Sequence, residues 1–196
     1  VAEALEADYW KPVQAGFEEG TDALLVSELI SNSITTIHPE VYKLKLAASP
    51  HIAAREENTA IDLDSVTESY HKIKESQVSD QKSPIIIEGA GGLLVPLNEN
   101  EFIIDLIRKL NAKVILVSRN YLGSINHSLL TAAVCKQHKL DIMGWVFNDQ
   151  YMQYEEEIVQ WSGYKKLGAI SFTKTIHKAF IKSEAVRIRL SLQSAL

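Results

Sequence analysis

The segment best suited to chemistry is Ile85-Ile86-Ile87-Glu88-Gly89-Ala90-Gly91-Gly92, in which an apolar run ends on a carboxylate and enters a glycine-rich turn. Burying an unpaired carboxylate at the end of a strand is costly, and a divalent cation or a lysine would compensate it. The glycines let backbone N–H groups approach an anion closely. The pattern predicts a cation and phosphate site at Glu88, although a solvated glutamate at a tight turn fits the local sequence equally well.

Two further charged residues, Lys11 and Asp22, have side chains whose charges would complete such a site. Asp22 starts a predicted helix, and its hard oxygen atoms suit it as a second Mg²⁺ ligand beside Glu88. A plain helix-capping role also accounts for Asp22. Lys11 lies inside a short predicted strand, before Pro12. It therefore either points into a site or extends its ammonium group to solvent at a sheet edge.

Three shorter motifs contain residues that are suited to binding other parts of a ligand. Ser49-Pro50-His51 turns into a helix, where His51 is either catalytic or has a capping or packing role. The loop at 122–127 enters a helix whose free N–H groups suit a carboxylate, with Ser124 as the ordinary cap. Asn148-Asp149 follows a strand, so the Asn148 amide either reads the edge of a base or marks a turn.

The elements that must position these residues alternate along the chain. Apolar runs predict strands over residues 9–13, 41–48, 84–88, 113–118, 141–148 and 167–171. Between and after them, helices are predicted over 21–30, 51–57, 62–76, 102–110, 124–138, 151–161 and from 176 onward, with a polar loop over 77–83. This pattern predicts an α/β fold with a parallel sheet covered by helices on both faces. Ligands bind such sheets at the carboxyl ends of the strands, which is where Lys11, Glu88 and Asn148 are expected.

Composition excludes several classes of protein. The chain has 196 residues, 46% of them hydrophobic and 23% charged, which excludes a disordered or disulfide-scaffold protein and fits one domain. A net charge of −5 argues against a nucleic-acid partner. The longest stretch without a charged side chain, 120–135, holds too many polar residues for a membrane span. The single cysteine, Cys135, is predicted to be a buried core thiol in a cytoplasmic protein.

Taken together and in this order, the segments resemble the dethiobiotin synthetase family, ATP-dependent enzymes of biotin synthesis. The residues that carry the resemblance are Tyr9-Trp10-Lys11-Pro12-Val13-Gln14-Ala15-Gly16, Thr21-Asp22-Ala23, Ser49-Pro50-His51, Ile87-Glu88-Gly89-Ala90-Gly91-Gly92, Val114-Ile115-Leu116-Val117, Leu122-Gly123-Ser124-Ile125-Asn126-His127 and Gly144-Trp145-Val146-Phe147-Asn148-Asp149. The resemblance implies a P-loop NTPase-like single domain over residues 1–196, and a homodimer. It also implies that a ligase joins 7,8-diaminopelargonate to CO₂ with Mg²⁺ and ATP. Carbamate and carbamic-phosphate intermediates would lead to dethiobiotin, ADP and phosphate.

The resemblance also implies roles for individual residues. Lys11 falls on the catalytic lysine, and Asp22 and Glu88 fall on the Mg²⁺ carboxylates. The positions implied for ATP are Asp22, Glu88, Gly89, Ala90, Gly91, Asn148, Asp149, Ser171 and Phe172. Those implied for the diamine substrate are Lys11, Ala15, Ser49, Pro50, Leu122, Gly123 and Asn126, the last three contributed across the dimer interface. Ala15 replaces a serine found in some members, so any contact there is through its backbone.

The largest departure from the family is that no G-x-x-x-x-G-K-[ST] motif occurs in these residues. We therefore expect the chain to begin inside the domain, with residues 1–7 as the end of a helix that follows a strand and the phosphate loop. Two alternatives stay open. One is an amidotransferase or cobyrinate-type synthetase of the same fold, which Cys135, in the middle of a predicted helix, does not favour. The other is a non-enzymatic module that binds the diamine or a partner without hydrolysing ATP.

Overall fold

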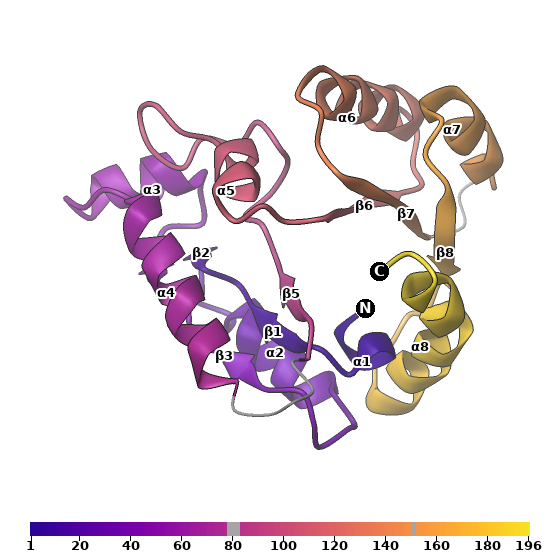
Figure 1. The fold of residues 1–196 in the computed structure, drawn as a ribbon, viewed down its shortest axis with the longest axis horizontal. Coiled ribbons are helices and arrows are strands. Elements are labelled where there is room, and N and C mark those ends of the chain that lie inside the picture. Colours follow the sequence, from indigo (N-terminus) through magenta and orange to yellow (C-terminus); the bar gives the residue numbers. More distant parts are fainter. Residues whose placement is uncertain (78–82, 150–151) are drawn as a thin grey trace. The chain divides into compact units, whose positions relative to one another are not determined.

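The computed structural model describes residues 1–77, 83–149 and 152–196. They form two units, residues 2–111 and residues 112–196 together with Val1 (Figure 1). Residues 78–82 of the predicted polar loop, and Tyr151 at the start of a predicted helix, lie outside the described residues. Within the described ranges, no helix has both the length and the apolar character needed to cross a bilayer.

The strands of the first unit are all parallel. β1 (Asp8–Trp10) lies between β3 (Ile37–His38) and β5 (Ile85–Ile87). β2 (Val13–Ala15) pairs separately with β4 (Tyr42–Leu44). Parallel pairing of apolar strands agrees with the predicted class, but β3 was not predicted, because two residues are too few to show a periodicity.

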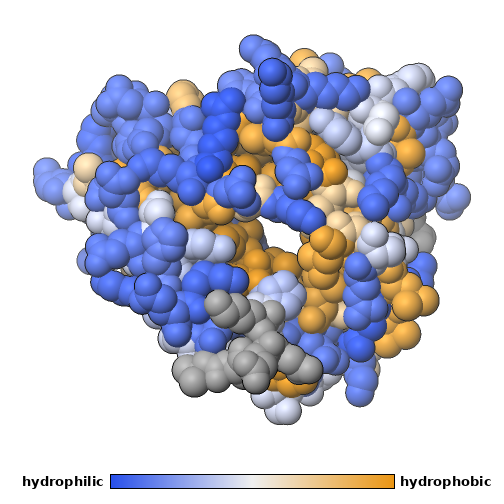
Figure 2. All heavy atoms as spheres, in the orientation of Figure 1, coloured by the Kyte–Doolittle hydropathy of each residue, from blue (hydrophilic) through white to orange (hydrophobic). Residues whose placement is uncertain are grey.

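Helices cover both faces of β1. Trp10 packs in one cluster with residues of three helices, and the neighbouring Tyr9 packs in another with residues of two. Successive residues of a strand point to opposite faces, so these clusters lie on the two faces of the sheet. The helices are α1 (Ala2–Leu5), α2 (Asp22–Leu29), α3 (Pro50–Glu56), α4 (Leu63–Ser76) and α5 (Ile103–Lys109). Figure 2 shows hydrophilic side chains over the outer side of α4, at the left of the view.

The predicted strand over residues 9–13 is wrong in one respect, because the chain breaks it into two. β1 ends at Trp10, and β2 begins at Val13 in a different pair of strands. Pro12 has no N–H to continue the ladder, and its carbonyl accepts instead from the backbone N–H groups of Val41 and Tyr42. Lys11 therefore follows a strand rather than lying inside one.

The predicted strand over residues 41–48 is also too long. β4 ends at Leu44, whose carbonyl accepts the N–H of Gly16 at 2.9 Å. Gly16 has a φ of 77°, and this left-handed conformation turns the chain away after β2. Beyond Leu44 the chain leaves this pair of strands, and Lys45 donates its backbone N–H to the Glu57 side chain.

A buried carboxylate, Asp8, ties β1 to the following segments. It accepts from the Thr36 N–H at 2.9 Å and the Gln77 amide at 3.0 Å, and it lies 3.1 Å from His38 Nε2. Burial alone would raise the pKa of the Asp8 carboxyl, but these hydrogen bonds and the His38 charge outweigh it, and the pKa lies below its usual value.

Asp8 is expected to contribute acid-sensitive stability. Its folded pKa lies below the unfolded value of about 3.9, so the contribution is complete above that pH and is lost as the pH falls through the folded pKa. Urea unfolding followed between about pH 7 and pH 2 should show Asp8→Asn less stable by about 2 kcal/mol at neutral pH, with a smaller further loss in acid. Asp141→Asn, an exposed control, should follow the wild type. Parallel pH profiles for Asp8→Asn and wild type would refute this role.

The second unit is a three-stranded parallel sheet in the order β6 (Val114–Arg119), β7 (Ile142–Asn148) and β8 (Lys166–Ile170). Its helices are α6 (Ser124–Gln137), α7 (Glu155–Ser162) and α8 (Lys178–Gln193). In Figure 1, α6 and α7 lie on one side of these strands and α8 lies on the other. Five successive residues in the middle of β7 are buried, as expected for a parallel strand covered on both faces.

Two helix starts in this unit differ from prediction. The helix predicted from residue 151 begins at Glu155, because Met152 and Gln153 have positive φ angles of 54° and 50° that a right-handed helix excludes. Gly123 rather than Ser124 occupies the N-cap of α6. The Ser124 hydroxyl instead lies 2.6 Å from the Tyr154 hydroxyl, so tertiary bonding replaces capping.

Gly144 is required where β7 passes β8. Its φ is 147°, and a Cβ there would lie 2.4 Å from the Lys165 carbonyl oxygen and 2.9 Å from Leu167 Cγ. The same carbonyl accepts the Trp145 N–H at 2.8 Å, so it cannot move away without breaking the ladder. We expect Gly144→Ala to lower the free energy of unfolding by about 3 kcal/mol.

Urea denaturation of Gly144→Ala and Gly92→Ala compares two glycines that differ in surroundings. A Cβ at Gly92 would meet nothing within 4 Å, and its φ is not positive. Gly92→Ala should therefore change the free energy of unfolding by less than about 0.5 kcal/mol. Equal midpoints for the two variants would show that the close approach of β7 and β8 does not limit stability.

Candidate functional site

The centre of the first unit's site is an ion triad formed by Lys11, Asp22 and Glu88. The Lys11 ammonium donates to Glu88 Oε1 at 3.0 Å and contacts Asp22 Oδ2. Lys11 is 8% exposed, whereas the carboxylate side chains are 39% and 45% exposed. The structure thus brings together, from three segments, the three charged residues that the sequence singled out.

Local structure explains how each member reaches the triad. Lys11 and Glu88 each follow the carboxyl end of a strand, β1 and β5, and these strands pair with Trp10 opposite Ile87. Thr21 caps α2 by accepting the Leu24 N–H at 3.2 Å, which leaves the Asp22 carboxylate available to Lys11. The capping role considered for Asp22 is therefore filled by its neighbour.

Protonation in the triad follows from burial and pairing. Burial alone would lower the pKa of the Lys11 ammonium, but hydrogen bonds with Asp22 and Glu88 outweigh it, and the pKa lies above its usual value. Burial raises the pKa of the Tyr9 phenol, and the Glu88 charge raises it further. Tyr9 therefore donates as a neutral phenol to Glu88 Oε2 at 2.8 Å. Lys11 is a fixed cation at neutral pH.

A cavity of about 360 Å³ opens beside the triad. Its lining residues are Lys11, Gln14, Ala15, Asp22, Ala48, Ser49, Pro50, Ala90, Gly91 and Val95. Seven of these were predicted from the sequence as site residues, and they come from segments spread along the first unit. Gly89 is not among the lining residues, and Glu88 reaches the site through its bond to Lys11.

Gln14 is a site residue whose role the sequence analysis missed. It is 6% exposed, accepts the Asp22 N–H at 3.3 Å and donates to the Gly16 carbonyl at 2.8 Å. It therefore joins the end of β2 to the start of α2. The signal in the sequence was a polar side chain, Gln14, between the apolar residues Val13 and Ala15.

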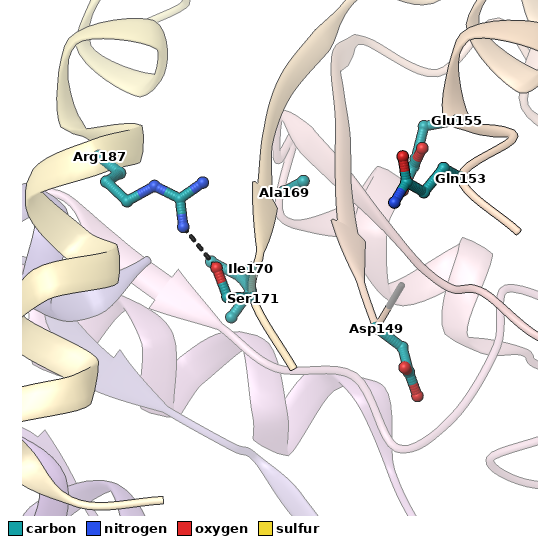
Figure 3. A pocket seen from close by; sticks show the side chains of 7 residues that line it. All are labelled: Asp149, Gln153, Glu155, Ala169, Ile170, Ser171 and Arg187. Carbon is teal, nitrogen blue, oxygen red and sulfur yellow. Dashed lines mark hydrogen bonds between the residues drawn. The ribbon is translucent and has the colours of Figure 1, made fainter. Parts of the chain in front are cut away.

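The second unit has its own cavity, of about 210 Å³, at the carboxyl ends of β7 and β8 (Figure 3). Its lining residues are Asp149, Gln153, Glu155, Ala169, Ile170, Ser171 and Arg187. Asp149 and Ser171 were predicted, whereas Asn148 and Phe172 are neighbours in sequence that do not line it. The other five lining residues were not predicted. The Asn148 side chain is exposed, and its oxygen accepts the Asp149 N–H at 2.9 Å.

The loop before α6 is open to solvent. Leu122 is 85% exposed, and Gly123 and Asn126 are exposed as well. The Tyr121 hydroxyl lies 2.5 Å from His127 Nδ1, which links the two ends of the loop. The backbone N–H groups in the first turn of this 14-residue helix are suited to a carboxylate.

Comparison with known proteins decides the family. A family model described as an AAA domain matches residues 1–179. The chain is 45% identical over 186 residues to a protein of Cytophaga hutchinsonii named ATP-dependent dethiobiotin synthetase BioD, covering 94% of this chain and 85% of that protein. The chain belongs to the dethiobiotin synthetase family. Membership identifies it as a ligase of the class that forms carbon–nitrogen bonds, and supports ATP-dependent dethiobiotin synthesis as its general activity.

Other members of the dethiobiotin synthetase family align over similar lengths. Proteins of the same name from Christiangramia forsetii and Afipia carboxidovorans are 39% and 40% identical, covering 98% and 87% of this chain and 88% and 77% of their own lengths. Among solved structures, a chain of the MinC:MinD cell division protein complex of Aquifex aeolicus matches with a TM-score of 0.60 at 11% identity. That match covers 98% of this chain and 87% of the other. The likeness shows the fold. Together with the AAA-domain match, it agrees with the predicted α/β, P-loop NTPase-like class.

The dethiobiotin synthetase triad has a donor set that fits Mg²⁺. Asp22 and Glu88 present hard carboxylate oxygens that converge on one cationic group, the Lys11 ammonium. Within the described ranges, no group of three or more His, Cys, Asp and Glu side chains is placed to hold a metal. One or two carboxylates, completed by water and phosphate oxygens, are what Mg²⁺ commonly takes from a protein.

Cys135 does not offer the nucleophile that an amidotransferase would need. It is fully buried in α6, as predicted, and burial raises the pKa of its thiol to about 11. A thiol with that pKa stays protonated at neutral pH and is unreactive. The position of Cys135 therefore favours the dethiobiotin synthetase interpretation over the amidotransferase alternative.

Proposed function

We propose that the protein joins CO₂ to 7,8-diaminopelargonate and closes the ureido ring of dethiobiotin, converting ATP to ADP and phosphate. The observation that carries this proposal is the Lys11 ammonium held between Asp22 and Glu88 at the wall of a cavity that also includes Ala90 and Gly91. A fixed cation beside a glycine-containing turn suits the meeting of an anionic substrate with nucleotide phosphates.

The proposed chemistry has three balanced steps. An amine nitrogen of the substrate attacks the carbon of CO₂ and loses a proton, giving a carbamate. A carbamate oxygen attacks the γ-phosphorus of ATP, and ADP leaves. The second amine then attacks the carbamic-phosphate carbon and loses a proton, and phosphate leaves as the ring closes. Lys11 offsets the repulsion between carbamate and triphosphate, which is large in a site of low dielectric constant.

The other residues of this site have the remaining roles in the proposal. Asp22 and Glu88 would hold Mg²⁺, which when bound supplies charge neutralisation at phosphate oxygens. The turn of Gly89, Ala90 and Gly91 would lie against the phosphates, and two of its residues, Ala90 and Gly91, line the cavity. Ala15, Ser49 and Pro50, which line the same cavity, would contact the diamine.

The family resemblance assigns the remaining roles in this proposal to residues of the second unit. Asn148, Asp149, Ser171 and Phe172 would contact adenine, which the cavity beside Asp149 and Ser171 supports. The exposed loop with Leu122, Gly123 and Asn126 would hold the substrate carboxylate of a second copy, making the protein a homodimer. The exposure of Leu122, and a helix start at Gly123 that has no side-chain cap, support this assignment.

The test supplies the full-length protein with 7,8-diaminopelargonate, ¹³C-labelled bicarbonate, Mg²⁺ and ATP. Mass spectrometry should detect dethiobiotin carrying one label, with one phosphate released per product and none formed without ATP. Diamine binding in calorimetry without labelled product would favour the binding-module alternative. Nucleotide-dependent conversion of a corrinoid, with no conversion of the diamine, would favour the cobyrinate-type alternative.

A further inference from the structure

The segment after β8 is held by one buried carboxylate on α8. Glu184 is 6% exposed, and its Oε2 accepts the Ser171 backbone N–H at 2.9 Å. Burial alone would raise the pKa of the Glu184 carboxyl, but hydrogen bonds from Ser171 and the Arg187 charge outweigh it and lower the pKa. Glu184 is therefore an ionised acceptor at the point where the chain leaves the sheet.

Arg187 closes a three-residue network with Glu184 and Ser171. Its Nη1 lies 2.8 Å from each Glu184 carboxylate oxygen and 2.6 Å from the Ser171 hydroxyl, the bond drawn in Figure 3. Ser171 and Arg187 both line the cavity of the second unit. The Glu184 carboxylate thus accepts hydrogen bonds from the backbone of one cavity-lining residue, Ser171, and from the side chain of another, Arg187.

The helix that carries Glu184 is itself closely seated on β8. A Cβ at Gly168 would lie 2.4 Å from Ile188 Cγ2 and 3.1 Å from Ile188 Cβ, so α8 and β8 leave no space for a side chain there. Ile188 is 3% exposed. Glu184 precedes Ile188 by about one helical turn. The close contact between Ile188 and Gly168 therefore fixes the position of Glu184 relative to β8 and to Ser171, which follows it.

We propose that Glu184 is a positioning residue that, together with Arg187, holds Ser171 and the chain after β8 in place against the base of the bound nucleotide. This inference rests on the proposed function, in which the same cavity takes adenine. A wall held in its binding conformation before the ligand arrives spares the cost of ordering it on binding. Loss of Glu184 is then expected to weaken nucleotide binding rather than to slow the chemical steps of the reaction.

The expected kinetic signature follows from the part of the nucleotide concerned, because the base takes no part in the bonds that form and break in the proposed reaction. Contacts with the base are made equally in the ground state and the transition state, so their loss raises KM and leaves kcat nearly unchanged. We expect Glu184→Ala to raise the KM for ATP about tenfold, with kcat and the diamine KM within about twofold of wild type. Glu184→Gln keeps an acceptor for the Ser171 N–H and should raise the KM about threefold.

The experiment measures steady-state kinetics and the binding of a fluorescent adenine nucleotide for Glu184→Ala, Glu184→Gln and Arg187→Ala. Arg187→Ala covers the case in which Glu184→Ala fails to fold, because Arg187 is half-exposed, and its expected effect on the ATP KM is about threefold. The control is Glu156→Gln, which removes an exposed ion pair with Lys166 at the other end of β8 and should leave all constants unchanged.

The outcomes separate this inference from the function on which it rests. If the wild type neither binds nor consumes ATP, the proposed function fails. If the wild type uses ATP and the folded variants keep its ATP KM, Glu184 is not a positioning residue. A fall in kcat with an unchanged KM overturns the inference as well. Raised ATP KM in Glu184→Ala, partial recovery in Glu184→Gln and no change in Glu156→Gln support it.

Discussion

Replacing Lys11 by alanine is expected to lower the rate of dethiobiotin formation by at least about 1,000-fold. The Lys11 ammonium is buried and bonded to both Asp22 and Glu88, so its removal leaves two neighbouring carboxylates without their cation. It also removes the positive charge that brings carbamate and γ-phosphate together. The loss should appear mainly in kcat, because the charge matters most where the two anions react.

Steady-state assays of Lys11→Ala should be read beside Lys11→Arg and Lys43→Ala. Arginine keeps the charge but spreads it over a wider planar group, so Lys11→Arg should recover only part of the rate and stay at least about tenfold below wild type. Lys43 is an exposed lysine of the same unit whose ammonium lies 4.9 Å from the centre of the Phe17 ring. Lys43→Ala should be as active as wild type.

The assignment of Lys11 would be wrong if Lys11→Ala kept more than about a tenth of the wild-type rate. Thermal unfolding of Lys11→Ala shows whether the variant is folded, because a misfolded variant would also be inactive. Lys11→Met fills the same volume without charge, so it should fold and should be as inactive as Lys11→Ala if charge is the decisive property.

Glu88→Gln is expected to lower the rate about 100-fold and to raise the Mg²⁺ concentration needed for half-maximal activity. A neutral amide is a poorer ligand than a carboxylate for a hard divalent cation. Glutamine keeps the shape of the side chain and an oxygen that can accept from Tyr9, so the fold should survive. Asp22→Asn should show the same two effects, since both carboxylates converge on one cation.

Titration of activity with Mg²⁺ distinguishes a ligand from a mere partner of Lys11. If Glu88 serves Lys11 alone, Glu88→Gln will change the maximal rate and leave the Mg²⁺ midpoint where it was, which would contradict the metal assignment. Asp64→Asn is the matched control, because Asp64 forms an ion pair with Lys109 in the same unit and its side chain is 83% exposed. Its Mg²⁺ midpoint and its rate should equal those of the wild type.

Much of the fold follows from local sequence. Continuous apolar runs became the strands β5, β6 and β7. Five successive residues of β7 are buried, as expected for a parallel strand covered on both faces. Asp62 caps α4 by accepting the N–H groups of Asp64 and Ser65, as the sequence predicted. Such signals are readable because the interacting groups are only a few residues apart.

Element lengths were less predictable, because partners elsewhere in the chain decide where a strand ends. The pattern over residues 41–48 alternates throughout, yet β4 stops at Leu44, where β2 turns away at Gly16. Residues 9–13 are apolar on both sides of Lys11, yet Pro12 sends the chain to a second pair of strands. Nothing within either segment shows where its partner ends.

By itself the sequence determined the class of fold and the residue types of the site: a parallel α/β architecture, and Lys11, Asp22 and Glu88 near the ends of strands or the start of a helix. It could not determine that these three side chains meet, or that Glu184 accepts a hydrogen bond from the Ser171 N–H. Each of those is decided by tertiary structure, because the hydrogen bonds and ion pairs join groups separated by up to 77 residues along the chain. Burial then makes each pairing strong, since a charge removed from water needs its partner.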